Sequence, residues 1–129
     1  MEEETKEETI DFLRRKVVSS MMWGKTLVLW SDKMQPDWVN EWNGSPSDFP
    51  IETICDFKQW RDRDTYMKIV RKDENMSHTG HEGRFQMNDL FTIIFLHTYV
   101  DDEYTKTVLD RTPGSENMLK FIVENPQRE

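Results

Sequence analysis

The chain has 129 residues, a formal net charge of −8 and a single cysteine, Cys55. This length fits one globular domain with short disordered ends. The negative charge disfavours general binding to nucleic-acid phosphates, and one cysteine excludes an intrachain disulfide. The acidic N-terminal stretch has no apolar signal sequence, and the longest apolar run is too short to span a bilayer, so we expect a cytoplasmic or nuclear protein with no membrane partner.

The N-terminal part has the pattern of a long helix. Thr5 and Glu8 match a capping box, and Gly24 is a natural helix stop. Apolar side chains recur between them at helical spacing: Ile10, Leu13, Val17 and Met21. We predict a helix from Thr5 to about Met22.

A short strand and a tryptophan-bearing helix come next. Residues 25–32 (KTLVLWSD) are typical of a buried strand. In residues 36–43 (PDWVNEWN) Pro36 suits a first helical turn, which would place Trp38 and Trp42 on one face. Residues 44–48 are a loop by composition.

Residues 48–71 allow two interpretations. Pro50 could lie in the first turn of a helix, but the sequence IETICDF also alternates, and we favour a strand because Thr and Ile are weak helix formers. Residues 64–71 alternate more clearly and predict another strand. The basic residues of this region are then expected on a solvated strand face: Lys58, Arg61, Arg63, Lys68, Arg71 and Lys72.

Residues 85–100 (FQMNDLFTIIFLHTYV) predict the central strand, after a polar loop at 72–83. Apolar residues fall on both sides of a period-2 pattern, as in a strand covered on both faces. We expect this cover over residues 90–96, with a bend or bulge at Asn88 and Asp89.

The C-terminal third predicts two more strands. Residues 101–103 read as a charged hairpin turn and residues 104–111 as the returning strand. Residues 118–124 alternate Leu119, Phe121 and Val123 against Lys120 and Glu124, which favours a final strand over a helix capped at Ser115.

These elements predict an α+β fold in which the N-terminal helix packs on a curved, mostly antiparallel sheet of about four to six strands. The order of the elements resembles that of nuclear-transport-factor-2-like and cystatin-like domains. The resemblance concerns element order alone and implies no site residues.

The ionisable residues give no catalytic signature. His97 and Cys55 could form a thiolate–imidazole pair, but both sit in apolar patterns and are expected to be structural. His78, His81 and Glu82 lack the spacing of a zinc site and fall in a glycine-containing loop. We therefore predict no metal, no cofactor and no enzymatic activity.

The five tryptophans are the most distinctive feature of the composition. Trp23, Trp30 and Trp60 are expected in the core. Trp38 and Trp42, with Asp37 and Glu41 beside them, are the candidate partner-binding residues, because tryptophan anchors interfaces and carboxylates would attract a basic or aromatic motif.

The sequence thus predicts a non-enzymatic adaptor or scaffold domain that self-associates, as a homodimer joined through the sheet. One alternative is a small-ligand-binding or enzymatic domain with a pocket inside the curved sheet, lined by Phe91, Phe95, His97 and Tyr99. Another is a reader of cationic or stacked ligands through the Trp38–Trp42 pair.

Overall fold

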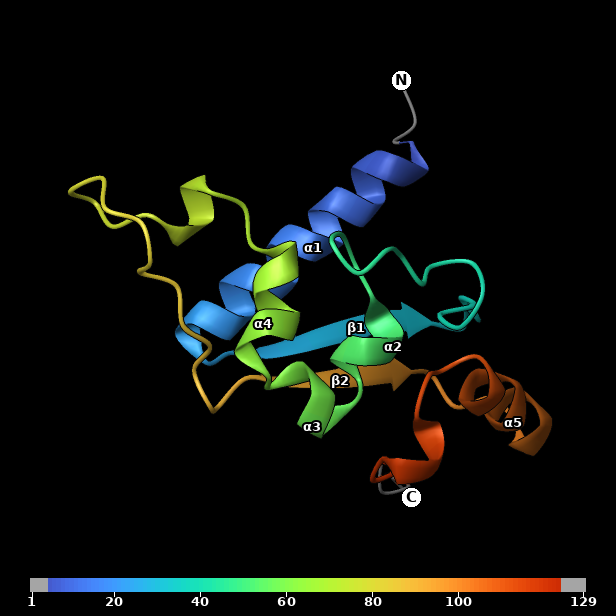
Figure 1. Ribbon diagram of the computed structural model, residues 1–129. Helices are drawn as coiled ribbons and strands as arrows, with labels where there is room; N and C mark the ends of the chain where they lie inside the picture. The colour runs from blue at the N-terminus through green and yellow to red at the C-terminus, as the bar shows by residue number, and fades with distance from the viewer. Residues whose placement is uncertain (1–4, 124–129) are drawn as a thin grey trace, which may run out of the picture.

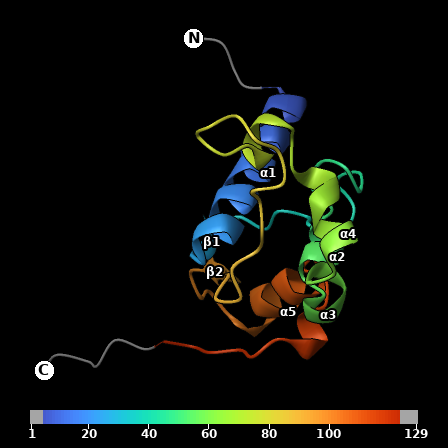
Figure 2. The ribbon, with the colours of Figure 1, turned by 60° about the vertical axis from the view of Figure 1, so that its left-hand side comes forward.

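The computed structural model describes residues 5–123. The chain is α+β and begins with a long helix, α1 (Lys6–Trp23), followed by strand β1 (Thr26–Asp32). Next come the helices α2 (Ile51–Ile54), α3 (Phe57–Trp60) and α4 (Arg63–Tyr66), and the 3₁₀ turns η1 (Met67–Ile69) and η2 (Asp73–Asn75). Strand β2 (Thr92–His97), helix α5 (Asp102–Asp110) and the 3₁₀ turn η3 (Ser115–Asn117) complete the order. Figures 1 and 2 show α2, α3 and α4 together on one side of the two strands.

Within the described residues, the sheet consists of β1 and β2, which pair in parallel, and an isolated bridge joins Met76 to Glu82. The prediction of a mostly antiparallel sheet of several strands is therefore wrong, and the layouts it resembled do not apply. Parallel strands require a long crossover connection. Residues 33–91 provide this crossover, and they carry α2, α3 and α4.

The N-terminal predictions are confirmed. The Thr5 hydroxyl accepts a hydrogen bond from the Glu8 N–H at 3.2 Å. Gly24 ends α1 in the left-handed conformation (φ 64°), with its N–H donating to the Ser20 carbonyl. β1 follows within the predicted range.

Three predicted strands are helical instead. Helix α2, which replaces the predicted strand IETICDF, has no side-chain cap, whereas α3, α4 and α5 each begin at an aspartate cap. Asp56, Asp62 and Asp101 each accept a hydrogen bond from a main-chain N–H three residues later, at the starts of α3, α4 and α5. Residues 101–103, which were predicted to form a hairpin turn, are thus the cap and first turn of α5. Their negative charges complement the dipole of this helix. In residues 48–61 the rejected helical alternative is the better one, since Pro50 directly precedes α2.

Residues 85–91 are not part of the central strand. Asn88 forms a turn in which its side-chain oxygen accepts from the Leu90 N–H at 2.9 Å, and β2 begins only at Thr92. Two main-chain carbonyls of this segment accept hydrogen bonds from arginine side chains. Arg63 donates to the Phe85 carbonyl at 2.8 Å, and Arg61 donates to the Phe91 carbonyl at 2.9 Å. These two arginines therefore hold the crossover in place and do not lie on a solvated strand face.

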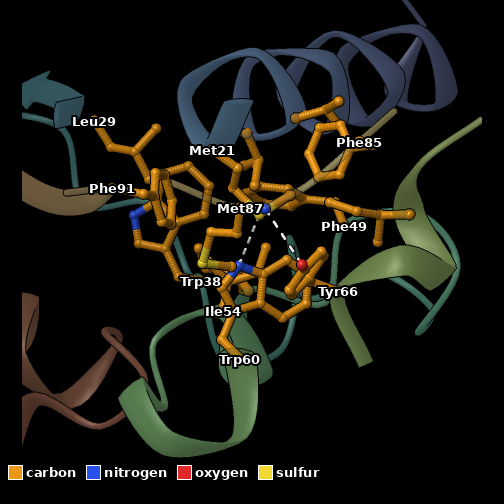
Figure 3. Packing of buried hydrophobic residues seen from close by; sticks show 14 residues of the cluster. Met21, Leu29, Trp38, Phe49, Ile54, Trp60, Tyr66, Phe85, Met87 and Phe91 are labelled. Atoms are coloured by element: carbon orange, nitrogen blue, oxygen red, sulfur yellow. Dashed lines mark hydrogen bonds between the residues drawn. The ribbon is translucent and has the colours of Figure 1, made fainter. Parts of the chain in front are cut away.

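The core lies between α1, the inner side of the sheet and the crossover (Figure 3). Trp60 is fully buried, as predicted, and its indole N–H donates to the Met21 sulfur at 3.2 Å. The Met87 N–H donates to the Tyr66 hydroxyl at 3.2 Å. Trp23 and Trp30 were also expected in the core, but 61% and 70% of their surface is exposed.

The two faces of the sheet differ sharply. Leu27, Leu29, Ile93 and Phe95 point inward and pack against the core. We call the opposite side, formed by Val28, Trp30, Ile94 and Leu96, the outer face; at least 45% of each of these side chains is exposed. The expectation of cover on both faces over residues 90–96 is wrong, which leaves an uncovered parallel sheet where such sheets are normally covered.

Residues 118–123 form no strand in the structure, so the predicted final strand is wrong over that range. Glu124 and the predicted disordered ends at residues 1–4 and 125–129 lie outside the described residues. No described helix has both the length and the apolar character needed to cross a bilayer.

Candidate functional site

A groove of about 600 Å³ runs beside β1, and we call it the edge groove. Its lining includes four consecutive β1 residues, 28–31. Successive residues of a strand point to opposite faces of the sheet. A groove that touches four in a row must therefore lie against the edge of the strand, and β2 occupies the other edge.

The main chain of β1 is unpaired along this groove. The Thr92 N–H donates to the Lys25 carbonyl, so alternate residues Leu27 and Leu29 also direct their main-chain groups toward β2. Val28 and Trp30 direct theirs toward the edge groove. No described residue outside the β1–β2 pair forms a main-chain hydrogen bond with Val28 or Trp30.

The walls of the edge groove are mostly apolar. Helix α1 contributes Thr9 and Leu13. The segment after β1 contributes Met34, Gln35, Pro36, Trp38, Glu41 and Trp42. Among the described residues of this lining, Glu41 alone is charged. The groove is therefore suited to an extended apolar chain that can also present a positive charge.

Three of the four predicted partner-binding residues line the groove: Trp38, Glu41 and Trp42. The short helix predicted for them is a single turn, in which the Asp37 carbonyl accepts from the N–H groups of Glu41 and Trp42. The fourth residue, Asp37, shapes this turn with its carboxylate, which accepts from the N–H groups of Val39 and Asn40. The Asn40 hydrogen bond is the main cause that lowers the pKa of Asp37.

The two tryptophan rings have different surroundings. Trp38 is buried and makes edge-to-face contacts with Phe49 and Phe95, at centroid distances of 6.3 and 5.9 Å. Its indole nitrogen has no hydrogen-bond partner among the described residues. Trp42 is half-buried, and the Lys6 ammonium lies 5.6 Å from its ring centroid. The rings do not form an open pair between which a flat ligand could stack.

The residues predicted to line an inner pocket are dispersed. Phe91 is buried in the core, and Phe95 packs against Trp38. His97 packs edge-on against Tyr104, and burial lowers its pKa. Tyr99 is half exposed and donates to the Asp102 carboxylate. None of the four lines the edge groove or a second hollow of about 340 Å³ near η3.

Cys55 is poorly suited to nucleophilic chemistry, because burial raises the pKa of its thiol to about 12. In the part of the chain that the structure describes, no three His, Cys, Asp or Glu side chains are grouped to hold a metal ion. His78 and His81 lie in the 72–83 loop, where the His81 imidazole contacts the Thr79 hydroxyl at 2.9 Å.

No protein-family model, curated protein or solved structure matches this chain.

Sequence reasoning missed the β1 part of the edge groove. Val28 and Trp30 were assigned to a buried strand because they stand in an apolar run. The polar residues at both ends of that run, Lys25 and Asp32, are compatible with an edge strand. Nothing in the sequence shows which edge β2 leaves open, because that depends on a pairing between residues more than sixty positions apart.

Proposed function

We propose that this chain is a non-enzymatic protein-interaction domain that binds an extended apolar segment of a protein partner in the edge groove. The partner segment would add to β1 as a further strand, with main-chain hydrogen bonds to Val28 and Trp30. The observation that carries the proposal is the contact of the groove with four consecutive strand residues, whose outward main-chain groups are unpaired.

The groove walls support an apolar partner with a basic residue. Leu13, Met34, Pro36 and Trp38 offer apolar surface to alternate side chains of an added strand. Glu41 offers a carboxylate to a lysine or arginine. A third strand would also widen the outer face of the sheet beside Val28 and Trp30.

The lone cysteine, half-buried and held as a thiol, supports a reducing location such as the cytoplasm or nucleus. Binding at a sheet edge requires no chemistry from that thiol or from His97.

Selection from a displayed library of random peptides tests the proposal. The wild-type chain should enrich peptides with alternating apolar residues and a basic residue, and calorimetry should then measure their affinity. Val28→Pro removes the outward N–H and should lose this binding, whereas Val28→Thr keeps the N–H and should retain it. Absence of enrichment, or equal affinity of the proline and threonine variants, would contradict strand addition.

A further inference from the structure

One segment of this chain has the exposed apolar character that the edge groove is suited to bind. Residues 118–123 (MLKFIV) leave η3 and run away from the rest of the chain, as Figure 2 shows. Leu119, Phe121, Ile122 and Val123 are between 62% and 93% exposed. Such a contiguous run of exposed apolar side chains is typical of an interaction surface.

The main chain of this segment is also unpaired. Residues 119–123 form no main-chain hydrogen bond with any described residue. Phe, Ile and Val favour strands, and the alternation of Leu119, Phe121 and Val123 is that of a strand. The segment therefore has a strand-forming sequence without a strand partner in the described part of its own chain.

Segment and groove match in length and charge. Six residues extend over about 20 Å as a strand, which is close to the length of the seven-residue β1. Lys120 is the one charged residue in 118–123, and it is positive. Glu41 is the one charged residue that the described part of the chain contributes to the groove lining, and it is negative.

We propose that residues 118–123 of one copy occupy the edge groove of a second copy, as a third strand beside β1. This inference rests on the proposed function, because it names the occupant of the same groove. Each copy carries both a groove and a segment, so reciprocal exchange about a twofold axis satisfies both at once and closes the assembly as a dimer.

Sedimentation of the full chain over a wide concentration range tests the inference. The wild type should form a dimer. Leu119→Asp/Phe121→Asp places charges on two exposed side chains, so it should leave the fold intact and weaken the dimer by about a hundredfold or more. Leu90→Asp, a matched change at a residue that is 75% exposed and outside the groove, should leave the dimer unchanged.

A synthetic peptide with the sequence of residues 118–123 provides the second arm. The peptide should bind the Leu119→Asp/Phe121→Asp chain, whose groove is free. It should not bind a chain that carries Val28→Pro in addition to these two substitutions. A wild-type chain that stays monomeric, or a double variant that dimerises like the wild type, would overturn the exchange. A chain whose groove is occupied by its own residues 118–123 would also stay monomeric, and that result would count against exchange between two copies.

Failure of this inference can be separated from failure of the proposed function. Library peptides that bind the wild-type groove but not the Val28→Pro groove would support the proposed function. If the 118–123 variants then have the same oligomeric state as the wild type, the groove binds another protein. If Val28→Pro leaves all peptide binding intact, the proposed function itself fails.

Discussion

At the residue scale, Trp38 combines buried packing with an indole N–H that has no hydrogen-bond partner among the described residues. Trp38→Ala should lower the free energy of unfolding by about 3–5 kcal/mol through loss of buried contacts. Trp38→Phe should cost less than about 2 kcal/mol, because it also removes a buried donor that lacks a partner. Urea unfolding of both variants measures the difference, and equal losses would show that the N–H has a partner.

The Cys55 thiol gives a second prediction at this scale. Because burial raises its pKa to about 12, the thiolate is scarce at pH 8. A disulfide-exchange reagent should therefore modify the folded chain far more slowly than the urea-unfolded chain. Rapid modification of the folded chain at that pH would contradict this description of the Cys55 site.

His97 should make stability depend on pH. Burial lowers its pKa below the ordinary value of 6.5, against a smaller opposing effect of a hydrogen bond to the Met34 main chain. The unfolded chain then binds the proton more readily, so the stability contributed by neutral His97 is present above pH 6.5 and is lost as pH falls through the lowered pKa.

His97→Gln removes this titration. Urea unfolding of wild type and variant at a series of pH values should show a difference in stability that changes below pH 6.5 and is constant above it. A constant difference throughout the series would mean that His97 has the same pKa in both states.

At the scale of elements, the two edges of β1 should respond differently to proline. Leu29→Pro removes an N–H that faces β2, so the lost ladder hydrogen bond should cost about 1–3 kcal/mol in addition to the lost packing of the Leu29 side chain. Val28→Pro removes an N–H that faces the groove and should cost about 1 kcal/mol or less. Thermal unfolding compares them, with Leu29→Ala as the control for lost packing; similar costs at both positions would refute the assigned orientation.

The elements that the sequence predicted well are those with local signals. Thr5 caps the start of α1 and Gly24 caps its end, each through contacts within four residues. The caps Asp62 and Asp101 are equally local, and they favour helices over the strands predicted at residues 64–71 and 104–111. Weak alternation in residues 64–71 and 104–111 suggested strands because the apolar positions of short amphipathic helices can mimic period 2.

At the scale of the whole molecule, the error in topology follows from distance along the chain. β1 pairs with β2 across a connection of about sixty residues, and no local pattern encodes a parallel partner so remote. The uncovered outer face and the exposed 118–123 segment are global features of the same kind. Trp38, Glu41 and Trp42 could be named from composition, whereas the free edge beside them required the structure.

The arrangement of the whole sheet is also the reason why we expect two copies of the chain to associate. The inner face of the two-stranded sheet packs on the core, but the edge of β1 at the groove is unpaired among the described residues and the outer face is apolar and exposed. A third strand from a second copy would pair that edge and enlarge the sheet. The folded chain should therefore gain stability as its concentration rises.

Amide hydrogen exchange at Val28 and Trp30 tests the central claim most directly. These N–H groups face the edge groove and have no main-chain partner among the described residues of one chain. We predict that their exchange slows markedly as the full chain is concentrated, and that it stays fast at every concentration in Leu119→Asp/Phe121→Asp. Fast exchange of both amides in the concentrated wild type would contradict strand addition at this edge.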